Sequence, residues 1–505
     1  MAFGWATERG YDHDVKRALH CTEILLADVK IYAYAAAPGQ AGPSGRAEPL
    51  CKTRIEPGHH TTFIGLPAVR ASMQNLPPHL NEALNFPLVE ALFGRRSRRF
   101  SLGASIPDGV FAYTSQSDPV PLTELERTLV LSAAAGVSGW NYLIMRNARY
   151  APHLPNYAGS AVGRPFPSPA GFETCDFFFT DDTGVYFLST RDAPAPADSP
   201  APEGIFDVET LLAAVRPRIR KLADGRLKIP AAEPHIEGHN TWCVNRPGSL
   251  LVIPVCDLAQ EIIATLCYFV QNGYCIYDDI HRESVPGIER FGRLVDTDNP
   301  LPLSYVEMLA VAECTAELST SCYAGALMLQ AMGLGGWMFD GMNPLSVLGA
   351  SGDAEVPGLG FRYDTDERWP LPNPTGLAGV FEGFCPPHYP DMQSAVTAFV
   401  HRKFGEEGPF HPGTPGPWKE SGLVRGSAEA HGEEFIECVS TMAQYVYDRF
   451  GKFPGTVPSI FLVTYLQAHH LDLAFYDRFF KEGAYLRTHA EHMAHWHGEN
   501  PKTGT

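Results

Sequence analysis

The stretch from residue 304 to residue 333, SYVEMLAVAECTAELSTSCYAGALMLQAMG, constrains the fold more than any other part of the chain. It contains no proline, and its side chains are apolar or small on nearly every face of a helix. We therefore predict one long helix here. A helix that is apolar all round lies in the middle of a large protein or in a subunit interface. The rest of the chain is expected to pack around it.

Part of this region, Leu318–Phe339, carries no charge and could be mistaken for a membrane span. It contains Ser319, Thr320, Ser321, Gln330 and several glycines, which are costly in contact with lipid. The N-terminus, MAFGWATERGYDHDVK, lacks the basic segment followed by an apolar core that marks a secretory signal. We therefore predict a buried helix, no membrane partner and a cytoplasmic protein.

Charge and cysteine content exclude other classes. The 505 residues include 39 Lys and Arg against 57 Asp and Glu, a net charge of −18. Nucleic-acid binding needs a positive field, so no nucleic-acid partner is expected. The 11 cysteines are odd in number and widely spaced, and none forms a C-x-x-C pair. Neither a disulfide framework nor a cysteine metal site is expected.

Three segments differ in composition. Residues 1–93 start with a helix-like pattern, become rich in Pro and Gly and end near a short helix at LNEALNFPLVEALFG, so we predict an extension that wraps a core. Residues 94–380 are expected to form that core. Residues 381–505 are predicted as a mainly helical extension, with helices at AEAHGEEFIECVSTMAQYVYDRF, SIFLVTYLQAHHLDLAFYDRFF and YLRTHAEHMAHWHG.

Local signals within the core are clear. Thr123 is followed three residues later by Glu126, the signature of a capping box at a helix start. FETCDFFFTDDTGVYFLSTRD reads as two strands joined by a turn at 182–184. SLLVIPVCDLAQEIIATLCYFVQNG is expected to be a strand that turns into a helix, and APAPADSPAPEG at 193–204 a surface loop.

The segment GRRSRRFS holds four arginines within five residues, which is unusual in so acidic a chain. Guanidinium groups bind phosphate bidentately and the hydroxyl of Ser97 adds a donor, so this segment is a candidate phosphate site. A solvated basic loop is the alternative.

Three further segments could contact a ligand. AAAGVSGWN (133–141) offers Ser138 and Asn141, RPFPSPAGFET (164–174) offers Ser168, and MGLGGWMFDGMNP (332–344) offers the turn at 340–341. Taken singly, the first two are ordinary turns. No P-loop and no G-x-G-x-x-G after a strand occurs, so a Rossmann nucleotide site is not supported.

In this order the four segments resemble the FMN-dependent nitroreductase superfamily. RRSRR resembles its R-R-S-x-R motif, GVSGWN its serine loop ending in Asn, and GLGGWMFDGMNP its G-L-G and P-I-E-G-F-D-P turn, with Asp340 in place of Glu. PSPAG resembles the P-S-A-G loop of the branch that dehydrogenates azoline peptides. The resemblance covers about residues 94–365. Phe100 follows the arginine motif one residue early, and Arg362 is the nearest candidate for the closing basic pair of the family.

The resemblance implies an α+β sandwich, with an antiparallel or mixed sheet and helices around the long central helix. It also implies a homodimer with FMN at the subunit interface and NAD(P)H as a possible electron donor. The expected activity is hydride transfer between flavin and a small organic substrate, either reduction of a nitro, quinone or activated alkene group or desaturation. The resemblance implies that Arg95, Arg96, Ser97 and Arg99 bind the phosphate and ribityl chain of FMN. It also implies that Ser138 and Asn141 lie along the pyrimidine side or the ribityl chain, and that Ser168 and Gly171 approach from a further loop. Asp340 and Gly341 would place a backbone N–H near the flavin N5.

The C-terminal region is rich in histidine, with His469, His470, His489, His492, His495 and His497. On a helix His489 and His492 share a face and could form half a metal site. No H-E-x-x-H motif or complete ligand set is visible, so polar, surface-facing histidines and no metal site are predicted. Two alternative functions stay open: a non-catalytic member that binds flavin, a related ligand or a partner protein, and a histidine-dependent metalloenzyme.

Overall fold

Strand β8 (Leu250–Asp257) lies inside the main sheet of the computed structural model, which describes residues 78–145, 158–193 and 208–498. The described residues belong to one compact unit. The predicted first helix, the Pro- and Gly-rich stretch after it and nearly all of the loop at 193–204 lie outside these ranges.

The main sheet is antiparallel at every described pairing. Its strands follow in the order β12 (Gly335–Phe339), β17 (Tyr465–His469), β8, β5 (Cys175–Asp181), β6 (Gly184–Leu188) and β7 (Ile219–Asp224), and β16 (Ile460–Phe461) pairs with β8. The fold is thus α+β, with antiparallel sheets and helices.

The predicted strand pair at FETCDFFFTDDTGVYFL is confirmed as β5 and β6. Their turn is held by Asp181, whose Oδ1 accepts hydrogen bonds from Thr183 N at 2.8 Å and Gly184 N at 3.2 Å. Phe177 and Phe179 enter one hydrophobic cluster and the Phe178 between them enters another. Successive residues of a strand point to opposite faces, so the sheet is buried on both sides at β5.

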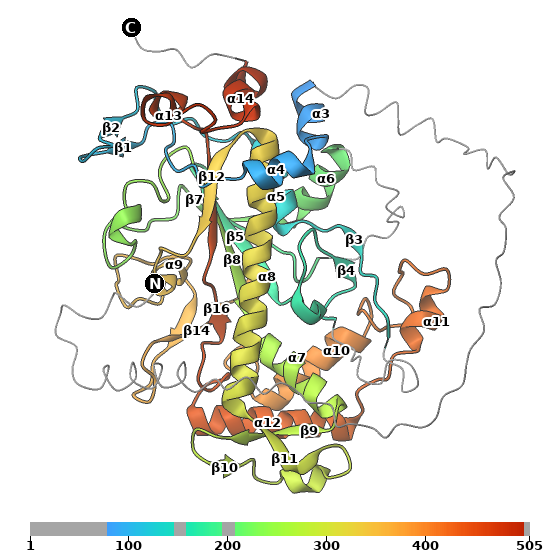
Figure 1. Ribbon diagram of the computed structural model, residues 1–505. Helices are drawn as coiled ribbons and strands as arrows, with labels where there is room; N and C mark the ends of the chain where they lie inside the picture. Colours follow the sequence, from blue (N-terminus) through green and yellow to red (C-terminus); the bar gives the residue numbers. More distant parts are fainter. Residues whose placement is uncertain (1–77, 146–157, 194–207, 499–505) are drawn as a thin grey trace, which may run out of the picture. The chain divides into compact units, whose positions relative to one another are not determined.

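The predicted long helix is confirmed as α8 (Leu303–Met332), which runs down the described unit in front of the sheet (Figure 1). It packs against α5 (Glu124–Ala135) and α7 (Leu258–Gln271). Much of the helix is buried, as predicted, but one side of it is exposed in a single chain. Tyr305, Met308 and Tyr323 are 45%, 59% and 37% exposed, because no described element covers this stripe of the helix.

The expected helix at SIFLVTYLQAHHLDLAFYDRFF is wrong in its first half. Residues 465–469 form β17, which pairs with β12 on one side and β8 on the other, and the helix α13 (Leu473–Phe479) begins only afterwards. Pairing with two distant strands outweighs the local pattern here. The predicted helices at α12 (Glu433–Phe450) and α14 (Arg487–His497) are confirmed. The segment 381–505 therefore shares a sheet with residues 94–380.

Smaller elements complete the described unit. The helices are α3 (Pro78–Leu84), α4 (Leu88–Gly94), α6 (Val208–Val215), α9 (Pro344–Leu348), α10 (Met392–Phe404) and α11 (Ser421–Gly426), with short 3-10 turns η1 (Pro169–Gly171), η2 (Arg216–Arg218), η3 (Gly238–Asn240) and η4 (Ile288–Phe291). The strands are β1 (Ser105–Ile106), β2 (Tyr113–Thr114), β3 (Gly139–Trp140), β4 (Val162–Gly163), β9 (Tyr274–Asp278), β10 (Glu283–Ser284), β11 (Asp296–Pro302), β13 (Arg362–Asp364), β14 (Asn373–Leu377) and β15 (Phe381–Glu382).

Two further findings concern expectations from composition. Among the described helices, none has the length and apolar character needed to cross a bilayer. Cys256 at the end of β8 and Cys314 on α8 form a disulfide, which the cysteine spacing did not predict. The free cysteines among the described residues are all buried.

Candidate functional site

The arginine segment leaves α4 and runs alongside β12. Arg98 and Gly336 exchange two backbone hydrogen bonds, from Arg98 N to Gly336 O at 3.3 Å and from Gly336 N to Arg98 O at 2.9 Å. The segment is therefore fixed against the edge strand of the main sheet. The turn at 340–341 directly follows the far end of this strand.

One of the four arginines is part of the fold. Arg98 is buried, and its guanidinium donates to Ala484 O at 2.9 Å, to Gln330 Oε1 at 2.8 Å and to Gly94 O at 3.1 Å. Burial lowers the pKa of Arg98 to about 10. Arg98 joins α8 to the loop before α14 and is not available to a ligand.

The other arginines face outward to different degrees. Arg96 is exposed and donates from one nitrogen to Phe93 O at 2.9 Å and to Arg95 O at 2.7 Å. Arg95 is half-buried and Ser97 is exposed. An anion that reached this loop would meet cations not committed to carboxylates.

Arg99 and the turn at 340–341 meet at Asn240, a residue that the sequence did not single out. Arg99 donates to Asn240 Oδ1 at 3.4 Å and lies 5.5 Å over the ring of Trp337. A Cβ added to Gly341 would lie 2.1 Å from Asn240 Nδ2, so the backbone approaches this amide closely. Asp340 is exposed beside it. The first and fourth predicted segments are thus brought together.

The second and third segments meet elsewhere. Ser138, Asn141, Ser168 and Gly171 line one cavity of about 310 Å³. Gly171 has a φ of 70°, and a Cβ added there would have no atom within 4 Å, so this position opens onto free space. Four residues predicted from two separate motifs therefore share a single cavity.

A buried carboxylate completes this cavity. Glu173 accepts a hydrogen bond from Asn141 Nδ2 at 2.8 Å through Oε1, and its backbone N donates to Ser168 Oγ at 2.9 Å. Its Oε2 is buried and has no hydrogen-bond partner among the described residues. Burial raises the pKa of Glu173 to about 7. A single carboxylate after a rigid loop gives no sequence signal, and Glu173 was not predicted.

The cavity is tied to α8 by a hydrogen bond from Ser168 Oγ to Glu317 Oε2 at 2.5 Å. Glu317 is buried, and burial raises its pKa. Arg98 holds the same helix at Gln330, thirteen residues further on. At 1.5 Å per residue, the two groups of predicted residues lie about 20 Å apart along α8. A single chain does not bring them together.

The prediction of surface-facing histidines is wrong for His469, His470, His489 and His492, which are 1%, 2%, 2% and 3% exposed. They are buried because β17 is an inner strand of the sheet and α14 packs on the end of α8. His489 and His492 do not act as a pair, since His489 Nδ1 accepts from Leu486 N. His492 instead lies with His470 and His497 around Glu126.

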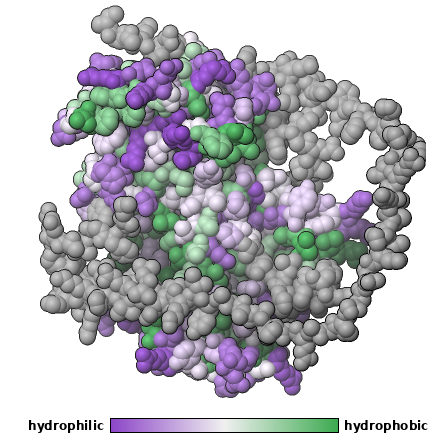
Figure 2. Space-filling view, in the orientation of Figure 1, coloured by the Kyte–Doolittle hydropathy of each residue, from purple (hydrophilic) through white to green (hydrophobic). Residues whose placement is uncertain are grey.

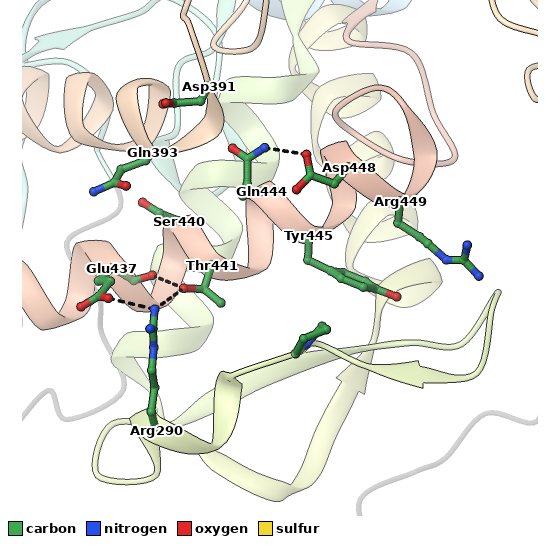
Figure 3. A pocket seen from close by; sticks show the side chains of 11 residues that line it. Arg290, Asp391, Gln393, Glu437, Ser440, Thr441, Gln444, Tyr445, Asp448 and Arg449 are labelled. Atoms are coloured by element: carbon green, nitrogen blue, oxygen red, sulfur yellow. Dashed lines mark hydrogen bonds and ion pairs between the residues drawn. The ribbon is translucent and has the colours of Figure 1, made fainter.

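A further cavity lies at the other end of α8 and is distinct from both groups. It has a volume of about 790 Å³ and is formed by α12 with the region around η4. Figure 3 shows Arg290 reaching across it to Glu437 at 2.8 Å and to Thr441 Oγ1 at 3.2 Å. Arg449 is paired with Glu283 at 3.2 Å. Because both arginines are already satisfied by the protein, this cavity is the weaker candidate.

Arg362, the candidate for a closing phosphate contact, is exposed and pairs with Asp364 at 3.1 Å on its own strand β13. Among the described residues, no hydrogen bond or ion pair joins it to the arginine segment. Its assignment to the phosphate gains no support from this position.

Comparisons with known proteins add little to this geometry. No family model matches the sequence, and no curated protein matches it. Among solved structures, the chain is similar to that of a putative nitroreductase from Ralstonia eutropha JMP134. The identity is 14%, the match covers 51% of this chain and 71% of that chain, and the TM-score is 0.24. A likeness of this size establishes neither fold nor function, so the resemblance rests on the motif residues.

Proposed function

We propose that the chain is an FMN-dependent, nitroreductase-like oxidoreductase whose flavin sites are shared between two copies of the chain. The proposal rests on the positions of the predicted residues, which form two separate groups at different heights along α8. One level offers Arg99 with the turn at 340–341, and the other offers the cavity beside Glu173. Each level holds only part of what the resemblance assigns to a flavin.

A second copy related by a two-fold axis would unite these parts. In an antiparallel crossing of two α8 helices, a residue above the crossing point meets one equally far below it. A crossing near Tyr323 therefore places the Gln330 level of one chain beside the Glu317 level of the other. Interfaces of this kind are isologous and are the commonest in soluble oligomers.

The surface around α8 favours such a partner. Tyr305, Met308 and Tyr323 lie exposed along the helix. Green side chains also gather over α4, beside the upper part of α8 (Figure 2). Four of the seven residues of α4 are exposed and apolar: Leu88, Val89, Leu92 and Phe93. Contiguous apolar patches on a soluble protein mark interaction sites.

The residues present fit the chemistry of FMN. The guanidinium groups of Arg95, Arg96 and Arg99 suit a phosphate. The cavity beside Glu173 is at the low end of the range for small-molecule sites, so it would enclose only part of a flavin. When bound, FMN supplies hydride transfer, while the protein supplies orientation, electrostatics and exclusion of water.

Glu173 is the group best placed to hold a proton at this site. Its pKa is raised to about 7 by burial, so the carboxyl gains and loses a proton near neutral pH. General acids and bases work best when their pKa lies near the working pH. The substrate side of the reaction, reductive with NAD(P)H or desaturating, is left open by these residues.

Binding of FMN tests the proposal directly. The purified chain should show flavin absorption and release FMN on denaturation, or bind added FMN. The double variant Arg95→Ala/Arg99→Ala should bind FMN at least about tenfold more weakly, because each charge-assisted hydrogen bond contributes about 1.5–3 kcal/mol. Arg293→Ala, an exposed arginine near η4, is the control. Oxidation of NADPH by the bound flavin would separate an oxidoreductase from a non-catalytic flavin-binding protein. Failure of the wild type to bind FMN would overturn the proposal.

The shared site has its own test. Phe93→Lys with Tyr323→Lys places two charges on the proposed interface, so we expect a monomer in sedimentation analysis and weaker FMN binding. Leu423→Lys on α11, where the native side chain is 70% exposed, is the matched control. A monomeric variant that retains FMN with unchanged affinity would contradict a site made by two chains.

A further inference from the structure

We propose that Glu126, His470, His492 and His497 bind one divalent transition-metal ion, with zinc as the expected occupant, and that this ion fastens helix α14 to the rest of the protein. This inference is independent of the flavin proposal, because none of the four residues belongs to either group of predicted flavin contacts. Of these four residues, the sequence suggested only His492 as part of a possible metal site, together with His489.

The four ligand atoms converge on one point. The Nε2 atoms of His470, His492 and His497 lie 3.1, 2.8 and 3.1 Å from the same oxygen, Glu126 Oε1. The Nε2 atoms of His470 and His497 lie 3.1 Å apart, and all four ligand atoms are within 4.8 Å of one another. Zinc bound tetrahedrally at about 2.0–2.1 Å has ligands about 3.4 Å apart. The cluster therefore has the spacing of a ligand set.

Backbone carbonyls fix which ring nitrogen faces the cluster. His470 Nδ1 lies 2.8 Å from Val120 O, and His492 Nδ1 lies 2.7 Å from Met332 O. A carbonyl oxygen only accepts, so each Nδ1 carries a hydrogen and donates it. In the neutral ring Nε2 then presents a lone pair to the centre. An Nδ1–H to carbonyl bond is the usual support of a metal-binding histidine.

When these two rings are neutral, the centre of the cluster holds no positive charge. Glu126 Oε1 is an acceptor, and the lone pairs of His470 and His492 point at it. His492 Nε2 is buried, and the polar atom it approaches is Glu126 Oε1, at 2.8 Å. Acceptors gathered in a buried site repel one another unless a cation or added protons lie between them. A metal ion satisfies all four at once.

The carboxylate is held in place by the start of its own helix. Glu126 is fully buried, and its other oxygen, Oε2, accepts from Thr123 N at 2.6 Å and from Thr123 Oγ1 at 2.7 Å. The predicted capping box is thus confirmed, and it leaves Oε1 for the histidines. An orienting contact of this kind is typical of carboxylate ligands in metal sites.

The position of the cluster indicates a structural role. Its ligands come from α5, from the residue after β17 and from α14, which are far apart in the sequence. Four protein ligands in a buried site describe a closed structural site, whereas catalytic zinc keeps a position for water. The last turns of the described chain would be pinned to α5 and to the end of α8.

The same helix supports the arginine segment. Thr488 Oγ1 at the start of α14 donates to Gln330 O at 2.8 Å, and Gln330 Oε1 accepts from Arg98. Arg98 also donates to Ala484 O, just before α14. Loss of the ion is therefore expected to loosen the packing around Arg98 as well as α14 itself.

Metal analysis of the full-length protein tests the proposal. We expect close to one zinc ion per chain by mass spectrometry after expression with added zinc. We also expect a lower melting temperature after treatment with a chelator, and recovery when zinc is returned. Another divalent transition metal at one per chain would support the same ligand set. A wild type that takes up no metal, and whose melting temperature is unchanged by chelator and by zinc, would overturn the proposal.

Variants locate the ion. His497→Ala removes the least buried ligand, whose side chain is 16% exposed, so we expect a folded protein whose metal retention falls at least about tenfold. Glu126→Gln keeps an acceptor for the capping box but removes the charge, and should also weaken retention. His495→Ala on the same helix is the control, since this side chain is exposed and lies 3.7 Å from Glu82. Equal loss of metal from His495→Ala would place the ion elsewhere and contradict the assignment.

Discussion

Helix α8 contacts buried polar groups at two levels, a C-terminal level around Gln330 and a middle level around Glu317. The polar groups at these two levels differ in their hydrogen bonding. At the C-terminal level, Gln330 receives hydrogen bonds from Arg98 and Thr488 on both its side-chain and backbone oxygens. At the middle level, Glu317 faces Ser168, and Glu173 keeps a buried oxygen without a partner among the described residues. At the C-terminal level the polar groups make hydrogen bonds within the protein. At the middle level Glu173 Oε2 is left to bind a ligand or a proton. The predictions below test this difference.

The largest effect is expected at Arg98, the centre of the C-terminal level. Arg98→Met keeps an apolar chain of similar length but removes three hydrogen bonds from a charged group, leaving Gln330 Oε1 and two carbonyls unpaired. We expect a loss of about 3–5 kcal/mol in the free energy of unfolding, measured with urea. Arg96→Met, on the exposed side of the same segment, should stay within about 0.5 kcal/mol. A loss below about 1 kcal/mol for Arg98→Met would mean that this level is not held as described.

The second prediction concerns pH at the middle level. The pKa of Glu173 rises from 4.5 to about 7 on folding, because burial outweighs the lowering by Arg164 and Asn141. The folded protein therefore binds a proton that the unfolded chain has already released between these values. The free energy of unfolding should fall by up to about 1.4 kcal/mol per pH unit as the pH rises through this window, and by about 3 kcal/mol in total.

Glu173→Gln isolates that contribution, since the amide does not titrate. Relative to the variant, the wild type should be most stable at the acidic end and lose this advantage as the pH rises from 4.5 to about 7. Glu355→Gln, an exposed carboxylate on a loop, is the control and should leave the slope unchanged. If the wild type and Glu173→Gln show the same pH dependence, the pKa of Glu173 does not rise on folding and the description of the middle level is wrong.

Local signals in the sequence account for the elements that were predicted correctly. The capping box of Thr123 and Glu126, the turn at Asp181 and the length of α8 each depend on residues a few positions apart. Strand β17 could not be found in this way, because it is defined by pairing with β8 and β12. Its apolar residues fit a buried helix as well as a buried strand.

The candidate sites show the same division. Motifs identified Ser138, Asn141, Ser168 and Gly171, but their shared cavity depends on Glu173 and on the fold around it. The histidine cluster depends on Glu126, which precedes His470 by 344 positions and had a sufficient local explanation as a capping residue. No spacing rule connects residues so far apart, so the sequence favoured solvent-facing histidines.

The smallest effect is expected at Ser168, which links the middle level to α8. Ser168→Ala removes the donor to Glu317 Oε2 and the acceptor of Glu173 N. A neutral hydroxyl contributes less than a guanidinium, so we expect a loss of about 1–2 kcal/mol on urea unfolding. Ser97→Ala, where the side chain is exposed, should change stability by less than about 0.5 kcal/mol. If Ser168→Ala lowered the free energy of unfolding as much as Arg98→Met, the polar groups at both levels would contribute equally to stability. The cavity would then not differ from the C-terminal level in having polar groups that can bind a ligand.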